Sequence, residues 1–144
     1  MTTATVSIPQ TTASRLYALG RSLLGLLFLI SGFLKITSFA GYSAWMASAY
    51  LPSPGLLLIL TMTTEIAGGL TLISGWNARW GAFALAIFLV PTTLIFHGFW
   101  RADLADSWNQ LNHILKNIGI LGGLISVFAS ESARVKHRTM TEAG

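Results

Sequence analysis

Four long apolar segments limit what this chain can fold into. They cover about 16–36, 55–74, 78–100 and 110–129. Each is close to the roughly 20 residues that a helix needs to cross the hydrocarbon core of a bilayer. Lipid cannot satisfy free backbone N–H and C=O groups, so spanning segments of this length form helices. The sequence therefore predicts an all-α fold, a four-helix transmembrane bundle.

The composition agrees with a membrane protein. Only 10% of the 144 residues are charged, whereas a soluble domain carries about 25%. Between Lys35 and Arg101 the charged residues are Glu65 and Arg79 alone. The net charge of +4 lies mainly near the two ends, which favours lipid headgroups over nucleic acid as partners. There is no cysteine, which excludes disulfides, thiol redox chemistry and iron–sulfur clusters.

Basic residues indicate the orientation in the membrane. Arg15 and Arg21 lie at the start of the first segment, Arg79 lies between the second and third, and 134–138 follow the fourth. Cytoplasmic loops collect Lys and Arg. We therefore expect both termini in the cytoplasm, with the protein integral to a bacterial plasma (inner) membrane. The expected organisation is a flexible cytoplasmic tail (1–14), a membrane domain (15–130) and a basic cytoplasmic tail (131–144).

The first outer loop, "FAGYSAWMASAYLPSP", is rich in aromatic residues. Six of its residues fall on one helical face: Phe39, Tyr42, Trp45, Met46, Ala49 and Tyr50. This pattern predicts a short interfacial amphipathic helix between helices one and two, lying among the headgroups. It would serve either as a simple anchor or as a lid over a pocket that an apolar ligand enters from the lipid.

The fourth segment carries a polar stripe in an otherwise apolar helix. The stripe consists of Asn109, Asn112, His113, Lys116 and Asn117, at helical spacing. Charge at the bilayer centre costs on the order of 3 kcal/mol or more, so such groups turn inward and pair. Glu65 lies about ten residues into the second segment, near the midplane. We therefore expect a polar pocket in the outer half of the membrane, with Glu65 as its buried acid and Lys116 as the counter-charge, Lys35 being the alternative.

Other polar and small residues share helical faces with these groups. The predicted faces are Gly25, Phe28, Gly32 and Lys35 on the first helix; Thr61, Thr64, Glu65, Gly68 and Gly69 on the second; and Thr93, His97, Trp100 and Arg101 on the third. Gly119 and Gly123 form a GxxxG motif, which is suited to close helix contact. Simpler interpretations remain open: Lys35 and Lys116 as snorkelling anchors, and His97 and His113 as interfacial residues.

These segments resemble the DoxX family of small four-helix membrane proteins. The similarity rests on "RSLLGLLFLISGFLKI", "YSAWMAS" with "LPSP", "TEIAGGLTLISGWNARWGA", "TTLIFHGFW" and "NHILKNIGILGGLI", in that order over about 15–130. The resemblance implies a membrane-associated oxidoreductase role. Some relatives are subunits of thiosulfate:quinone oxidoreductases, and others join oxidative-stress complexes.

The leading hypothesis is a quinone-linked oxidoreductase, or an accessory subunit of one. Its catalytic residues would be Glu65, His97 and Lys116, with Lys35, Asn112, His113 and Asn117 binding the cofactor. Hydrogen bonds to the two quinone oxygens and a route for protons are what such a site needs. A haem ligated by His97 and His113 is less favoured, and no metal site is expected. The electrons would come through the quinone or a redox partner subunit.

Two other functions fit the same sequence. The first is a non-enzymatic membrane partner or a small transporter of apolar compounds, which would need a homo-oligomer because four helices make a small transporter. The second is a scaffold whose polar core only fixes the helix register. Replacing Glu65 and Lys116 together by apolar residues would then be tolerated.

Overall fold

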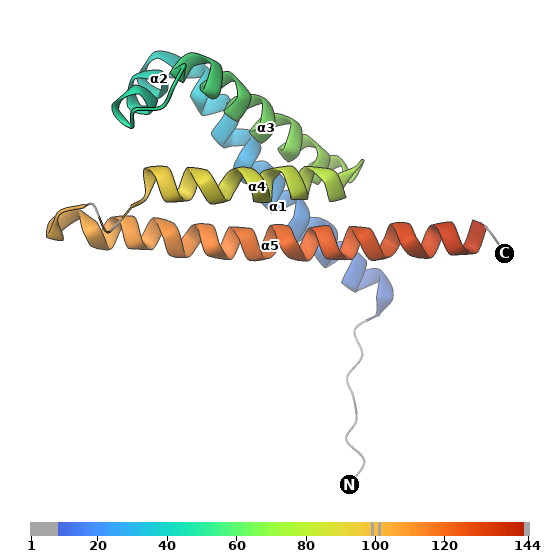
Figure 1. Ribbon diagram of the computed structural model, residues 1–144. Coiled ribbons are helices and arrows are strands. Elements are labelled where there is room, and N and C mark those ends of the chain that lie inside the picture. Colours follow the sequence, from blue (N-terminus) through green and yellow to red (C-terminus); the bar gives the residue numbers. More distant parts are fainter. Residues whose placement is uncertain (1–8, 99, 101, 143–144) are drawn as a thin grey trace, which may run out of the picture.

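The computed structural model describes residues 9–98, 100 and 102–142. The elements are α1 (Gln10–Thr37), α2 (Phe39–Ser48), α3 (Pro54–Ser74), α4 (Ala78–Phe96) and α5 (Leu104–Glu142). All but α2 are long and apolar enough to cross a membrane, and no described residue lies in a strand. The predicted all-α bundle is thus confirmed, with a shorter helix between the first two long ones (Figure 1).

The helix boundaries follow from local chemistry. Pro54 lies in the first turn of α3, where its missing N–H leaves no bond unmade, and Gly75 ends that helix with a positive φ of 80°. α4 stops at Phe96 because His97 leaves helical geometry, with φ −120° and ψ 37°. The predicted helical stripe through Trp100 is therefore wrong beyond Phe96, and Arg101 lies outside the described residues.

Two helices extend further than the apolar segments. α1 begins at Gln10, inside the predicted N-terminal tail, and residues 1–8 lie outside the described chain. α5 has 39 residues, which makes it about 58 Å long at 1.5 Å per residue. A hydrocarbon core is only about 30 Å thick, so α5 is longer than a crossing requires. Its last part projects past the other helices (Figure 1). The segment predicted as a basic tail is thus helical up to Glu142.

Glycines bring α1 and α3 into very close contact. A Cβ added to Gly25 would lie 2.6 Å from the carbonyl oxygen of Gly69, and one added to Gly69 would lie 2.7 Å from that of Gly25. Such small residues let helix backbones approach, which is how helices associate where lipid offers no hydrophobic driving force. The predicted faces of these two helices, with Gly25, Phe28 and Gly32 on α1 and Glu65, Gly68 and Gly69 on α3, are buried as expected.

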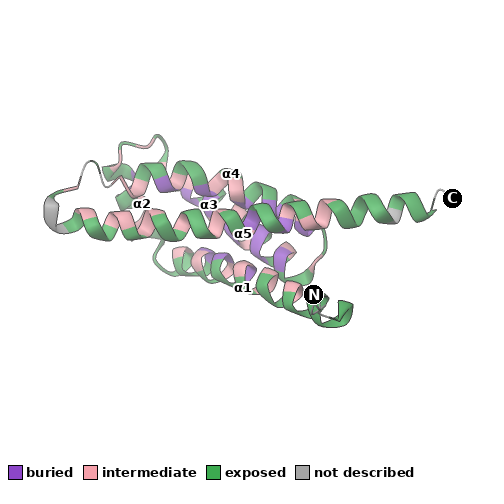
Figure 2. Cartoon of the chain, turned by 90° about the horizontal axis from the view of Figure 1, so that it is seen from below, coloured by how far each residue is buried: buried purple, intermediate pink, exposed green. Residues whose placement is uncertain are grey.

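α4 packs on α3 and α5 and completes the core. The buried apolar cluster of the bundle draws on α1, α3, α4 and α5 and appears as purple stretches between the helices in Figure 2. It consists of Phe28, Leu72, Ala78, Ala82, Leu85, Leu89, Leu124 and Val127. Large apolar side chains such as Leu26, Ile87 and Ile118 remain exposed on the outside of the bundle. Lipid contact accounts for such a surface, because acyl chains solvate apolar side chains as well as a protein core does.

α1 and α5 contact each other toward one end of the bundle only. We call this the termini end, and the opposite end, which carries α2, the α2 end. Leu24 lies 3.0 Å from a Cβ added to Gly123, whereas a Cβ added to Gly119 would meet no atom within 4 Å. The predicted close contact at the GxxxG motif is therefore right at Gly123 and wrong at Gly119. Toward the α2 end the two helices leave space between them.

Candidate functional site

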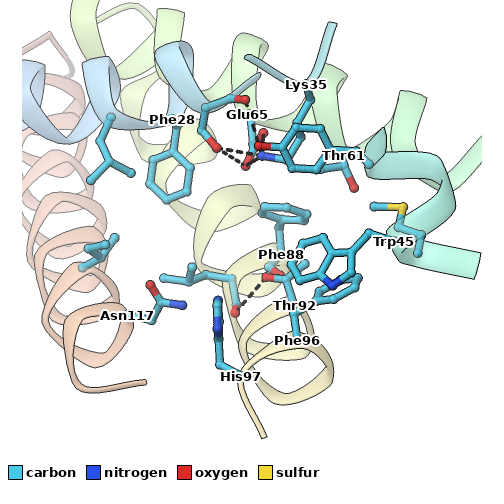
Figure 3. A pocket seen from close by; sticks show the side chains of 16 residues that line it. Phe28, Lys35, Trp45, Thr61, Glu65, Phe88, Thr92, Phe96, His97 and Asn117 are labelled. Atoms are coloured by element: carbon cyan, nitrogen blue, oxygen red, sulfur yellow. Dashed lines mark hydrogen bonds and ion pairs between the residues drawn. The ribbon is translucent and has the colours of Figure 1, made fainter. Parts of the chain in front are cut away.

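A cavity of about 200 Å³ lies at the α2 end, with walls from all five helices. We call it the α2-end cavity. Its polar lining is Ser31, Lys35, Thr61, Glu65, Thr92, His97 and Asn117, and its other lining residues are Leu27, Phe28, Tyr42, Trp45, Met46, Phe88, Leu89, Phe96 and Ile120. In Figure 3, Lys35 and Glu65 lie on one side, and His97 and Asn117 lie across the cavity from them.

A buried ion pair forms the α1–α3 wall of this cavity. The ammonium nitrogen of Lys35 lies 2.8 Å from Oε2 and 3.0 Å from Oε1 of Glu65, and Glu65 is only 4% exposed. The expectation that Lys116 is the counter-charge is wrong, because Lys116 is exposed on α5. Gly32 allows the actual pairing: a Cβ there would lie 3.3 Å from the Cβ of Glu65, so α1 approaches α3 one turn before Lys35.

Ser31 completes the hydrogen bonding of the pair. Its hydroxyl donates to Oε1 of Glu65 at 3.1 Å and accepts from the Lys35 ammonium at 2.7 Å. The ring of Tyr42 from α2 lies 5.4 Å from the same nitrogen, within cation–π range. Both charges are therefore well solvated by protein groups, as burial in a low-dielectric interior requires. Ser31 was not among the predicted site residues, although its i, i+4 spacing from Lys35 indicates this contact.

The opposite wall offers uncharged hydrogen-bonding groups. The amide nitrogen of Asn117 donates to Oγ1 of Thr93 at 2.9 Å, and Thr93 in turn donates to the carbonyl of Leu89 at 2.7 Å. That arrangement leaves the second N–H and the carbonyl oxygen of Asn117 free of partners among the described residues. The hydroxyl of Thr61, on the ion-pair side, likewise has no partner in the described chain. These groups can bond a ligand without breaking an existing contact.

A chain of hydrogen bonds fixes the orientation of His97. Nε2 of Gln110 donates to Asp106 at 2.8 Å, so Oε1 of Gln110 is the atom that faces Nδ1 of His97 at 3.1 Å. Because an amide oxygen only accepts, Nδ1 of His97 must donate. In the neutral ring Nε2 then carries the lone pair, ready to accept a proton.

His113 stacks on His97 rather than lining the cavity. The two rings are 4.6 Å apart with an interplanar angle of 9°. Ring nitrogens lie in the ring planes, so face-to-face stacking does not direct them at a common point, as two axial ligands of one haem would need. His113 thus supports the ring of His97 from outside. Among the described residues, no group of three or more His, Cys, Asp or Glu side chains is placed to hold a metal ion.

The polar stripe of α5 is divided between two directions. Asn117 lines the cavity and His113 is half-buried, whereas Asn109, Asn112 and Lys116 are exposed and lie outside the lining. The stripe covers more of the helix circumference than α4 can cover. The predicted placement of Asn112 and Lys116 inside the pocket is therefore wrong, while Lys35, Glu65, His97 and Asn117 come together as predicted.

α2 forms the end wall. Trp45 packs against Phe96 of α4, with ring centroids 4.3 Å apart, and Met46 is buried. The predicted helix is present, but Tyr50 does not share its face: it follows α2 with a φ of 56° and is 95% exposed. Three further lining residues of α4 were not predicted: Phe88, Thr92 and Phe96. They lie outside the face of Thr93 and His97 that the helical spacing predicted.

The arrangement is an apolar, aromatic box with a charged pair in one wall and neutral donors in the other. Leu27 and Trp45 line the box and are still 43% and 47% exposed, so they mark where it opens to the outside. Such a site can hold a small planar ring in contact with aromatic side chains and bond polar atoms at opposite edges of that ring.

Comparison with known proteins finds a family model and two inner membrane proteins that this chain is similar to. The DoxX family model matches residues 16–98, which include most of the cavity lining. The inner membrane protein YqjF of Escherichia coli (strain K12) is 33% identical over 105 residues, 73% of this chain and 75% of that protein. The inner membrane protein YphA of the same strain is 27% identical over 100 residues, 69% of this chain and 71% of that protein. No solved structure matches the chain significantly.

Proposed function

This chain belongs to the DoxX family of membrane proteins, and from that premise we propose that it is a quinone-linked oxidoreductase, or a subunit of one, which binds a quinone ring in the α2-end cavity. The observation that carries the proposal is the Lys35–Glu65 pair, buried in the wall of an otherwise aromatic cavity. Ionisable groups inside a membrane span are expensive and generally mark functional sites.

The size and lining of the cavity suit a ring rather than a whole lipid-like molecule. Its volume of about 200 Å³ is below the roughly 300–1,000 Å³ of pockets that enclose drug-sized ligands. A quinone head group would lie among Phe28, Phe88 and Phe96, and its apolar tail would leave past Leu27 toward the lipid. Trp45 of α2 would cover the ring, which corresponds to the lid of the two alternatives for that helix.

The polar groups are arranged to bond the two oxygens of such a ring. On one side the hydroxyl of Thr61 is a free donor, beside the Lys35 ammonium, whose N–H groups already bond Glu65 and Ser31. On the other side the free N–H of Asn117 is a donor. A bound quinone supplies a redox couple of two electrons and two protons. On one side the ammonium of Lys35, paired with the Glu65 carboxylate, holds a proton, and on the other side Nε2 of His97 accepts or returns one. The electrons come from a redox partner or a reduced substrate.

We assign no catalytic role to Lys116, Asn112 or His113. The first two are exposed outside the lining, and His113 acts on the site only through its stacking on His97. Lys35 takes the place that Lys116 was expected to hold.

The proposal includes an orientation, with both termini in the cytoplasm and the α2-end cavity in the outer half of a bacterial inner membrane. Because the natural chain has no cysteine, one introduced thiol reports its side without background. Ser48→Cys should react with a membrane-impermeant maleimide in whole cells, and Met140→Cys only after lysis. The reverse pattern would invert the orientation.

Binding of a water-soluble short-tail quinone to the purified full chain in nanodiscs tests the site. We expect Glu65→Gln and Lys35→Met to weaken binding at least about tenfold, since one hydrogen bond to a charged group contributes about 1.5–3 kcal/mol. Lys116→Met is the matched control, because it removes a lysine that lies outside the cavity. Equal affinity in all four proteins would remove the proposal.

Transport of an apolar compound is the second candidate. It is favoured by the separation of α1 and α5 at the α2 end, which gives the cavity a side opening. Proteoliposomes distinguish the two functions: uptake driven by a proton gradient without any electron donor supports transport, whereas quinone turnover with a donor supports the oxidoreductase.

A further inference from the structure

A second cavity, of about 530 Å³, lies at the termini end of the bundle. We call it the termini-end cavity. It is bounded by α1, by the turn between α3 and α4, and by the C-terminal third of α5, which runs past that turn (Figure 1). Three arginines line it, each from a different helix: Arg21 of α1, Arg79 of α4 and Arg134 of α5. None of them belongs to the site described above.

Arg21 is the unusual member of this group. Its Nε and Nη1 atoms are buried and have no hydrogen-bond partner among the described residues. Its guanidinium lies against Gly75, where an added Cβ would come within 2.8 Å of Nη2. A buried donor on a charged group without an acceptor costs about 1–3 kcal/mol or more. The described chain thus supplies no acceptor to these two nitrogens, and the Arg21 side chain is part of the cavity lining.

Neither of the two glutamates in the cavity lining accepts a hydrogen bond from the buried nitrogens of Arg21. Glu131 accepts a hydrogen bond from the Tyr17 hydroxyl at 2.9 Å and lies 3.6 Å from Arg134. Glu142, the other acid in the lining, makes no ion pair with a described residue. Arg79 is directed at the ring of Trp80, 4.8 Å away. With three arginines and two glutamates, the lining has an excess of positive charge, centred on Arg21 and Arg79.

From this geometry we infer that the termini-end cavity binds a phosphate group, held mainly by Arg21 and Arg79. The planar fork of a guanidinium matches two phosphate oxygens at once, and such charge-assisted bonds are short and strong. The first turn of α4, which carries Arg79, adds the positive end of a helix dipole. Trp76 and Trp80 line the cavity and are mostly exposed, as aromatic residues at headgroup level are.

The phosphate could belong to an anionic lipid or be a free anion, and the experiment separates these sources. The full-length protein is placed in phosphatidylcholine nanodiscs and titrated with short-chain phosphatidylglycerol or with inorganic phosphate, while tryptophan fluorescence is followed. Trp76 and Trp80 report on the cavity directly. The variants are Arg21→Gln and Arg79→Gln, and the matched control is Arg15→Gln, which removes an exposed arginine of α1 outside the cavity.

We expect saturable binding that weakens at least about tenfold in Arg21→Gln and in Arg79→Gln and stays unchanged in Arg15→Gln. Saturation by phosphatidylglycerol alone assigns the site to a lipid headgroup, and saturation by inorganic phosphate assigns it to a free anion. An equal loss in Arg15→Gln would show only diffuse attraction to positive charge and would overturn the inference. If neither phosphatidylglycerol nor inorganic phosphate binds saturably, the inference is likewise overturned. Arg79→Gln keeps the test decisive if Arg21→Gln fails to fold.

Discussion

At the α2 end, Lys35 and Glu65 neutralise each other across two helices, and Ser31 bonds to both. At the termini end, Arg21 lies against the turn at Gly75 with two guanidinium nitrogens unpaired among the described residues. Both ends bury charge beside glycine. In the first case the protein itself supplies the opposite charge, and in the second an outside anion would have to. The α2-end cavity is thus complete before a ligand binds, whereas the termini-end cavity is not.

Breaking the ion pair gives the largest expected effect. Lys35→Met leaves the Glu65 carboxylate buried without its partner and should reduce the free energy of unfolding by about 3–5 kcal/mol. The double variant Lys35→Met/Glu65→Leu should recover most of that loss. Reversible unfolding of the full chain in mixed micelles measures both values. A site role predicts that the stable double variant still fails to bind quinone, and retained binding would favour the scaffold function.

Glycine substitutions compare the tight α1–α3 contact with the open face of α5. Gly69→Ala should destabilise the protein by about 1–3 kcal/mol, because its Cβ would lie 2.7 Å from the carbonyl oxygen of Gly25. Gly119→Ala introduces the same methyl group where no atom lies within 4 Å. It should be neutral or stabilise the protein by up to about 1 kcal/mol through better helix propensity. Thermal unfolding of the two variants checks the contrast, and a large loss at Gly119 would indicate a contact with another molecule.

The aromatic contact of α2 separates a lid from a simple anchor. Trp45→Ala removes a ring pair with Phe96 worth about 0.5–1.5 kcal/mol beyond its buried area. If α2 covers a bound ring, the dissociation rate of a quinone should increase about tenfold, in addition to the loss of stability that the missing ring pair causes. Trp108→Ala, which removes an exposed tryptophan of α5, serves as the control in a stopped-flow measurement. The same rate in both variants would leave α2 as an anchor.

Tyr17 gives the smallest expected effect and probes the α1–α5 contact at the termini end. Tyr17→Phe removes the hydroxyl that donates to Glu131 at 2.9 Å, and it should cost about 1 kcal/mol of stability. Tyr50→Phe removes a hydroxyl from a residue that is 95% exposed and should cost nothing measurable. Chemical unfolding of the two variants gives the comparison. Equal values would mean that the Tyr17 hydroxyl bond contributes little.

Much of this fold could be predicted from the sequence because the bilayer imposes it. The length of the apolar segments fixed the number of long helices, and the cost of a carboxylate in lipid required Glu65 to face inward. The partner of Glu65 could not be predicted in the same way. Residue counts place Lys35 and Lys116 at one depth, but depth does not say which helix packs against α3. The glycines bring Lys35 close to Glu65 by letting the backbones of α1 and α3 approach each other. The helical periodicity of a sequence carries no information about the distance between two helices.

Two further features could not be predicted from the sequence pattern: the residue at which α4 ends, and the distribution of the polar stripe around α5. An apolar run continues through Phe99 and Trp100, yet the helix stops at Phe96, and this places His97 at a C-cap, directed into the cavity. On α5 the sequence shows which residues are polar, but it does not show how much of the helix surface α4 covers. Asn117 therefore reached the cavity, and Lys116, one residue earlier, did not.

The central claim is that the Lys35–Glu65 pair forms part of a quinone site, and the content of the protein as it leaves its own membrane tests this most directly. Mass spectrometry would quantify the quinone that copurifies with the wild-type chain, Glu65→Gln and Lys116→Met. We predict about one quinone per chain, or per assembly, in the wild type and in Lys116→Met, and almost none in Glu65→Gln. Quinone at the same trace level in all three proteins would contradict the account.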